Sequence, residues 1–160
     1  MDQKETEEKR FLFGKNWKEF LKSLNQEKID FSKKCLLDFL KEEDLKSKKF
    51  LDVGSGSGLS SLVAKLAGAE VHSFDYDINS VECTEHLKQS YFPDDSKWEI
   101  EQGSALDAQY LESLGKFDIV YSWGVLHHTG KMYKALELVE KNVADNGKLF
   151  ISLYNDQGFT

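Results

Sequence analysis

Apolar residues recur along this chain with two different spacings, and the change between them divides it into two parts. Within 15–24 and again within 29–40 they fall at the i, i+3, i+4 spacing of amphipathic helices. From about residue 48, short apolar runs alternate with helical segments. We therefore expect a polar, disordered tail over 1–10, a helical extension over 11–47 and the main domain over 48–160.

The main domain alternates strictly between strand and helix. Apolar runs predict strands at about 49–53, 70–75, 97–102, 117–122 and 148–153, and helices fit between them at about 58–67, 78–90, 107–114 and 131–143. Compact alternation of this kind favours an α/β fold, in which a parallel sheet carries helices on both faces. Ligands of such sheets bind at the carboxyl ends of the strands.

A glycine-rich segment, DVGSGSG at 52–58, follows the first predicted strand and leads directly into a helix. Glycines at alternate positions permit positive φ and a close approach of the main chain to a ligand, and the next helix offers unpaired N–H groups. A dinucleotide-binding turn, GxGxxG, would place glycine at position 59, where this chain has Leu59. A connection that binds nothing is the alternative.

An acidic pair closes the second predicted strand, seventeen residues past Gly58. A carboxylate at this position can accept both hydroxyl protons of a ribose. Asp75 is the favoured acceptor, and Asp77 is expected to cap the helix that follows it. The reverse assignment of the two residues stays open.

Four segments together, DVGSGSG, VHSFD, EQGSALD and FDIVYSWGVLHH, resemble the class I S-adenosylmethionine-dependent methyltransferases over about residues 48–153. The resemblance implies a Rossmann-like, mostly parallel sheet with strand order 3-2-1-4-5. It also implies S-adenosyl-L-methionine as the cofactor and a small-molecule methyl acceptor. Residues 11–21 are similar to the N-terminal helical extension of many small-molecule methyltransferases.

The same resemblance assigns cofactor contacts to particular residues. It implies that the glycine turn packs against the methionine part of the cofactor, that Asp75 holds the ribose hydroxyls, and that the loop after the third strand flanks the adenine beside Tyr76. The residues implied in this way are Asp52, Gly54, Gly56, Gly58, Asp75, Tyr76, Ser104, Ala105 and Ser122.

The segment after the fourth strand bears on the reaction. Enzymes of this family that methylate amines of nucleic acids and glutamine show N/D-P-P-Y/F here, whereas this chain has SWGV at 122–125. The resemblance therefore favours transfer to oxygen or carbon. His127 and His128 are the candidate general bases, because histidine titrates near neutral pH. Alternatively each histidine only hydrogen-bonds the main chain, and we expect no metal site because no carboxylate stands beside them at ligand spacing.

Aromatic residues near the expected site have two interpretations. Phe11, Phe13 and Trp17 either pack on the core, which their helical spacing favours, or form a lid over the cofactor. Trp123, where the fourth strand meets the site, contacts either the substrate or the core.

Composition narrows the class of partner. The 160 residues carry a net charge of −7, and only one of the 21 basic residues is an arginine, Arg10. Residues 1–49 hold 13 basic and 11 acidic side chains (+2), and residues 50–160 hold 8 and 17 (−9), so we expect no nucleic acid partner. Two cysteines outside any metal-binding pattern, no apolar run of membrane-spanning length and no signal peptide predict a cytoplasmic protein.

The last part of the chain departs from the family pattern. The family's sheet has seven strands, and only seven residues follow Leu153, so we expect the usual last two strands to be lacking. Residues 145–147, Asp-Asn-Gly, are expected to reverse the chain before the fifth strand. The strand KLFISL at 148–153 would then be an open edge, which we expect to form a homodimer or to be covered by the N-terminal helices.

Three functions are open on the sequence alone. Methyl transfer from S-adenosyl-L-methionine to a small molecule is favoured. A non-catalytic cofactor-binding or assembly module would account for the missing strands. A nicotinamide-dependent dehydrogenase would use the same sheet and ribose acid, but Leu59 disfavours it.

Overall fold

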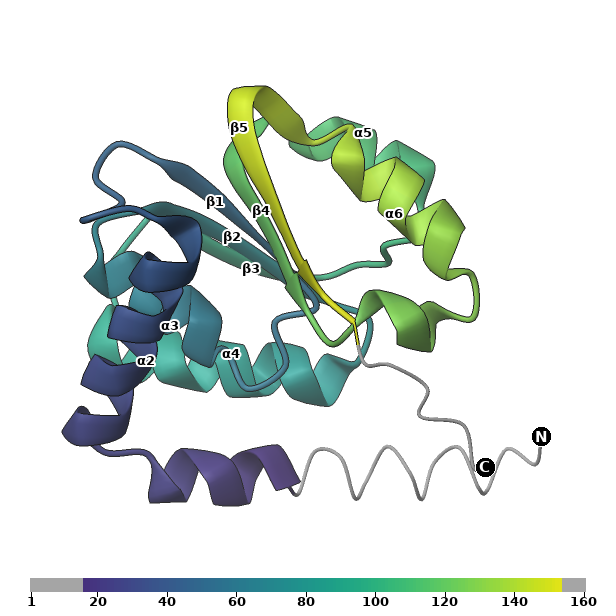
Figure 1. The fold of residues 1–160 in the computed structure, drawn as a ribbon. Helices are drawn as coiled ribbons and strands as arrows, with labels where there is room; N and C mark the ends of the chain where they lie inside the picture. Colours follow the sequence, from purple (N-terminus) through teal and green to yellow (C-terminus); the bar gives the residue numbers. More distant parts are fainter. Residues whose placement is uncertain (1–15, 154–160) are drawn as a thin grey trace, which may run out of the picture.

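The computed structural model describes residues 16–153, and this part of the chain contains one five-stranded sheet (Figure 1). All four strand pairs are parallel and the strand order is β3-β2-β1-β4-β5, which confirms the predicted Rossmann-like topology. The strands are β1 Lys49–Val53, β2 Glu70–Asp75, β3 Trp98–Gln102, β4 Phe117–Trp123 and β5 Val143–Ser152. The tail predicted over 1–10 lies outside the described residues.

Helices lie on both faces of the sheet, as the alternation predicts. Residues 16–23 are helical, and the elements that follow are α2 Gln26–Leu40, α3 Leu59–Leu66, α4 Ile78–Tyr91, α5 Ala108–Leu114, the 3-10 helix η1 Leu126–Thr129 and α6 Met132–Glu140. Helices α2, α3 and α4 cover one face, and α5 and α6 cover the other (Figure 1). Among the described helices, none is long and apolar enough to cross a membrane.

Short polar side chains determine where three of these helices begin. Asn25, Asp77 and Asp107 each accept a hydrogen bond from a main-chain N–H in the first turn of α2, α4 and α5, respectively. Those N–H groups have no partner within the helix, so each cap stabilises the helix start. The predicted capping role of Asp77 is confirmed.

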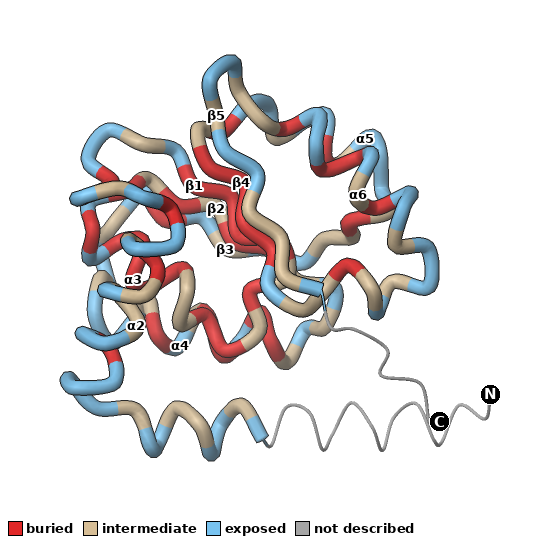
Figure 2. Tube along the Cα trace, viewed as in Figure 1, coloured by how far each residue is buried: buried red, intermediate tan, exposed pale blue. Residues whose placement is uncertain are grey.

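The central strand β1 supplies residues to two separate cores. Phe50 is buried with α2 and α3 on one face of the sheet, and Leu51 and Val53 are buried with α5 and α6 on the other (Figure 2). A strand covered on both faces forms a continuous apolar run, which is the pattern that predicted it. Ile29 and Leu36 of α2 belong to the first core, so the helical extension packs into the main domain.

The fifth strand begins earlier than the sequence predicts. The predicted helix over 131–143 ends at Glu140, and β5 begins at Val143 instead of 148. Phe117 pairs with Val143 and Ile119 with Lys148, so residues 144–147 form a bulge within β5. Asn146 adopts a φ of 61° in this bulge. Residues 145–147, which we expected before the fifth strand, thus lie within β5 as it is observed.

Strand β5 lies at an edge of the sheet and has β4 as its neighbour among the described strands. The end of α2 and the residues that follow it contact one of its faces: the Lys148 ammonium donates to the main-chain carbonyl of Leu40 (2.6 Å) and to the Glu42 carboxylate (2.7 Å). The Phe39 and Phe150 rings also lie 5.6 Å apart. These contacts cover a face of β5 and not its outer hydrogen-bonding edge. The homodimer stays a prediction.

We expect the chain to self-associate at micromolar concentration through the outer edge of β5. Leu149 is the site for a disrupting charge because it is 36% exposed, whereas Ile151 packs against the core shared with α5 and α6. Sedimentation velocity should therefore show a dimer for the parent chain and a monomer for Leu149→Lys. A monomeric parent at all concentrations tested would exclude pairing through this edge.

Candidate functional site

The glycine turn after β1 is held against β2 by main-chain hydrogen bonds and packs against the Val125 side chain on its other side. The N–H groups of Gly54 and Ser55 both donate to the Phe74 carbonyl of β2 (2.9 and 3.0 Å). Gly54, Gly56 and Gly58 all have positive φ, and a Cβ at Gly54 would lie 2.5 Å from the Val125 side chain. The turn therefore requires glycine for its conformation and for its close contact with the loop after β4.

The Asp75 carboxylate joins the end of β2 to this turn. Its Oδ2 accepts the Gly56 N–H and its Oδ1 accepts the Asp77 N–H, each at 2.9 Å. Burial raises the pKa of Asp75, and these main-chain N–H groups act in the opposite direction. Each oxygen keeps a further lone pair for a ligand.

The loop after β3 lies beside the same site. The Gly103 N–H donates to the Asp75 carbonyl (3.0 Å), and the Gln102 side chain donates to the Tyr76 carbonyl (3.0 Å). Tyr76 is exposed and Ser104 is partly exposed. The structure thus brings the turn, Asp75, Tyr76 and Ser104 together at the carboxyl edge of the sheet.

Other predicted site residues are buried beneath this edge. Gly58 and Ala105 are buried. Ser122 is fully buried, and its hydroxyl donates to the Val53 carbonyl (3.1 Å), which joins β4 to β1. Asp52 is 2% exposed and accepts a hydrogen bond from the Ser61 hydroxyl at 2.6 Å. Cofactor contacts by these residues stay predictions.

The pKa of Asp52 is raised to about 7. Burial is the main cause, the Ser61 hydrogen bond acts in the opposite direction, and the charge of Asp75 adds to the increase. A carboxylate in a low-dielectric interior is costly, so its charged form depends on the few groups that reach it. Asp52 therefore titrates near neutral pH directly below the glycine turn.

The two candidate bases follow β4 on the 3-10 helix η1. The His127 and His128 rings lie 3.9 Å apart between centroids. Burial lowers the pKa of His127, and the neighbouring His128 lowers it further, so the imidazole of His127 is neutral and able to accept a proton near pH 7. No group of three or more metal-ligating side chains that could hold a metal ion occurs within residues 16–153.

Two tryptophans flank the site from different elements. A Cβ at Gly56 would lie 3.2 Å from the Trp17 indole, so the helix over 16–23 reaches the glycine turn through this side chain. Trp123 is 44% exposed and its ring stacks against Phe150 at 6.1 Å. Phe11 and Phe13 lie outside the described residues.

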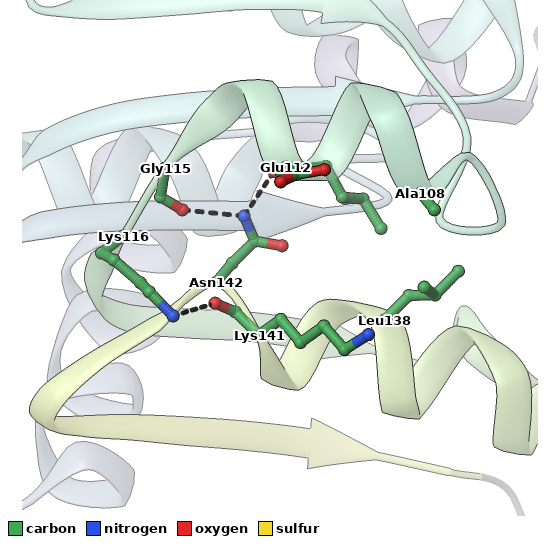
Figure 3. A pocket seen from close by; sticks show the side chains of 8 residues that line it. Ala108, Glu112, Gly115, Lys116, Leu138, Lys141 and Asn142 are labelled. Carbon is green, nitrogen blue, oxygen red and sulfur yellow. Dashed lines mark hydrogen bonds between the residues drawn. The ribbon is translucent and has the colours of Figure 1, made fainter.

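A cleft of about 440 Å³ lies between α5 and α6, away from these residues (Figure 3). Its lining includes Lys116, which precedes β4, and Asn142, which precedes β5. The Asn142 amide donates to the carbonyls of Leu111 and Gly115 at the end of α5 (2.7 and 2.8 Å). The cleft is thus at the amino ends of the strands, opposite the edge where parallel sheets bind ligands.

Comparison with known proteins identifies the family. Residues 18–158 match the family model described as a methyltransferase domain. The chain belongs to this family. The matched region therefore begins within the helix that carries Trp17, and it includes all of α2.

Individual relatives match only part of their own length. The chain is 30% identical over 130 residues to the ribosomal protein L11 methyltransferase of Helicobacter hepaticus, a match that covers 75% of this chain and 40% of that protein. It is 37% identical over 87 residues to the corresponding Prochlorococcus marinus enzyme, covering 52% of this chain and 28% of that protein. The chain thus spans less than half the length of these curated relatives.

A solved structure shares the fold at low sequence identity. The magnesium protoporphyrin IX methyltransferase of Synechocystis, solved with bound S-adenosylhomocysteine, superposes with a TM-score of 0.58 at 20% identity, covering 74% of this chain and 51% of that one. At this identity the likeness is one of fold.

Sequence reasoning missed three buried residues around Asp52. Ser61 of α3, Ser73 of β2 and Trp98 of β3 form a hydrogen-bonded series that ends on this carboxylate. The available signal was a buried serine beside the apolar residues of α3, LSSLVAKL. Its partners lie on two other elements, so periodicity alone could not connect them.

We expect Asp52→Asn to remove a pH dependence of folding stability. Because the folded-state pKa is about 7 and the ordinary value is 3.8, Asp52 stabilises the fold at low pH, and this contribution is lost as the pH rises through 7. The free energy of unfolding of the parent chain should fall by about 2–3 kcal/mol more between pH 5 and pH 8 than that of Asp52→Asn. Urea denaturation at both pH values measures the difference, and parallel curves would show that Asp52 is ionised throughout.

Proposed function

We propose that this chain binds S-adenosyl-L-methionine at the carboxyl edge of its sheet and transfers the methyl group to an oxygen or carbon atom of a small-molecule acceptor. The observation that carries the proposal is the geometry of Asp75. Each of its carboxylate oxygens already accepts one main-chain N–H, and each retains one lone pair for one of the two hydroxyls of a ribose.

The surroundings of Asp75 support this cofactor. The exposed ring of Tyr76 stands next to it along the chain, and Ser104 is partly exposed on the adjacent loop; these positions fit an adenine beside the ribose. The glycine turn on the other side would take the methionine part. A methyltransferase of the same fold was solved with bound S-adenosylhomocysteine, which supports the choice of cofactor.

Methyl transfer needs few catalytic groups from the protein. A methyl group moves from a sulfonium to an acceptor by direct displacement, so alignment of the two reactants contributes most of the rate enhancement. A base is required only where the acceptor must lose a proton. We propose His127 or His128 for that role, because the lowered pKa of His127 keeps its imidazole neutral.

We expect Asp75→Asn to weaken binding of S-adenosyl-L-methionine by about 1–3 kcal/mol, because the ribose hydroxyls lose a charged acceptor. Isothermal titration calorimetry measures the affinity. Asp118→Asn is the matched control, since the Asp118 carboxylate also accepts a main-chain N–H, that of Lys49 (2.8 Å), but at the amino ends of the strands. Equal affinities for the parent chain and Asp75→Asn would remove Asp75 from the ribose site.

We expect methyl transfer from labelled S-adenosyl-L-methionine to a pool of small metabolites. His127→Asn or His128→Asn should lower the turnover by about 100-fold or more while the cofactor affinity stays the same. The names of the curated relatives make ribosomal protein the comparison acceptor. Labelling of that protein alone would correct the acceptor class, and cofactor binding without transfer to either would indicate a non-catalytic module.

A further inference from the structure

Four side chains from four elements form a continuous hydrogen-bonded series inside the protein. The Trp98 indole N–H of β3 is 3.0 Å from the Ser73 hydroxyl of β2, which is 2.6 Å from the Ser61 hydroxyl of α3, which in turn is 2.6 Å from Asp52 Oδ2 of β1. All four residues are at most 2% exposed. Asp52 and Ser73 are also register partners in the sheet.

The donor at each step follows from the chemistry of the groups. An indole N–H can only donate, and Ser61 has one hydroxyl proton, which it donates to Asp52. The bond between the two serines must then be donated by Ser73, whose oxygen accepts from Trp98. Every proton in the series therefore points toward the carboxylate, and the 2.6 Å contact at its end has the length of a charge-assisted bond.

The charged and titratable neighbours of Asp52 in the described part of the chain do not neutralise it. Asp75 of β2 acts on it with the same sign of charge. Tyr121 of β4 is its other register partner and carries a neutral phenol, whose pKa burial raises to about 12. The buried lysine of α3, Lys65, pairs with Asp95 at 2.7 Å.

We propose that Ser61, Ser73 and Trp98 hold Asp52 as an anion beneath the glycine turn, and that this buried charge makes the turn select a positively charged ligand over a neutral one of the same shape. Charges in a low-dielectric interior act over several ångströms, so Asp52 need not touch the ligand. Ser61 and its partners are positioning residues in this arrangement. The selectivity rests on the proposed function, because the relevant pair is the sulfonium of S-adenosyl-L-methionine and the neutral thioether of S-adenosylhomocysteine.

The hydrogen-bonded series is tested first without any ligand. The indole N–H resonance of Trp98, assigned with Trp98→Phe, should shift with pH as Asp52 ionises. The shift should be absent in Asp52→Asn and should move to higher pH in Ser61→Ala, which removes the hydroxyl that stabilises the anion. Ser60→Ala, on the same helix, is the control and should titrate like the parent chain. A Trp98 resonance that ignores pH in the parent chain, or titrates unchanged in Asp52→Asn, would overturn the series.

The selectivity is tested by titrating both ligands into the parent chain and the same variants. When the pH is lowered from 8 to 5.5, the preference of the parent chain for S-adenosyl-L-methionine over S-adenosylhomocysteine should fall. This fall should be at least about fivefold larger than the change in Asp52→Asn. At pH 7.5, Ser61→Ala should already show the weaker preference, and Ser60→Ala should not.

The two proposals fail in different ways. Absence of binding of either ligand to the folded parent chain would reject the proposed function, and the Trp98 titration would still decide the series. Tight binding of both ligands with the same pH dependence in the parent chain and Asp52→Asn would reject the selectivity and leave the function standing. Circular dichroism of each variant confirms that it is folded.

Discussion

Asp75 accepts hydrogen bonds from the main chain at two places, and these bonds hold the end of β2 against the turn after β1. The Gly56 N–H and the Asp77 N–H each lie 2.9 Å from one of its oxygens. The turn and the residue that caps α4 are therefore positioned by the carboxylate of Asp75, and the loop after β3 is positioned by the main-chain carbonyl of the same residue, which accepts the Gly103 N–H. Its own partial burial follows from this role, because the groups that it holds together also surround it.

The carboxylate of Asp52 lies deeper than that of Asp75, and its ionised form is costly there. Asp52 is in the core, where an ionised group is tolerated only with strong hydrogen bonds. The Ser61 hydroxyl supplies one at 2.6 Å, and Ser73 and Trp98 fix its direction. The two acids thus differ in their surroundings: Asp75 is partly exposed and Asp52 is enclosed. The roles that we propose follow from this difference, hydrogen bonding to a ligand for Asp75 and an effect of charge for Asp52.

The two N-terminal helices, which precede the alternating strands and helices, belong to the same packed domain. Helix α2 contributes Ile29 and Leu36 to the core, and Trp17 from the preceding helix contacts the glycine turn. The family match likewise includes most of the extension. The N-terminal helices thus pack against the core, and the side chain of Trp17 lies next to the glycine turn.

The alternation of strands and helices, the position of the glycine turn and the capping by Asp77 could be predicted from short-range patterns: the spacing of apolar residues, alternate glycines and a short acid before a helix. The strand order is not a short-range property, and its prediction came from the resemblance of four segments to a known family. The bulge at 144–147 could not be predicted, because it arises from the pairing of β5 with β4. Nor could the enclosure of Asp52 and Ser122, since their neighbours come from elements distant in the chain. Local sequence patterns were thus enough to predict the order of strands and helices along the chain and the chemical groups at the strand ends. Which of those groups face the site depends on how distant elements pack against one another, and this packing is seen in the folded protein alone.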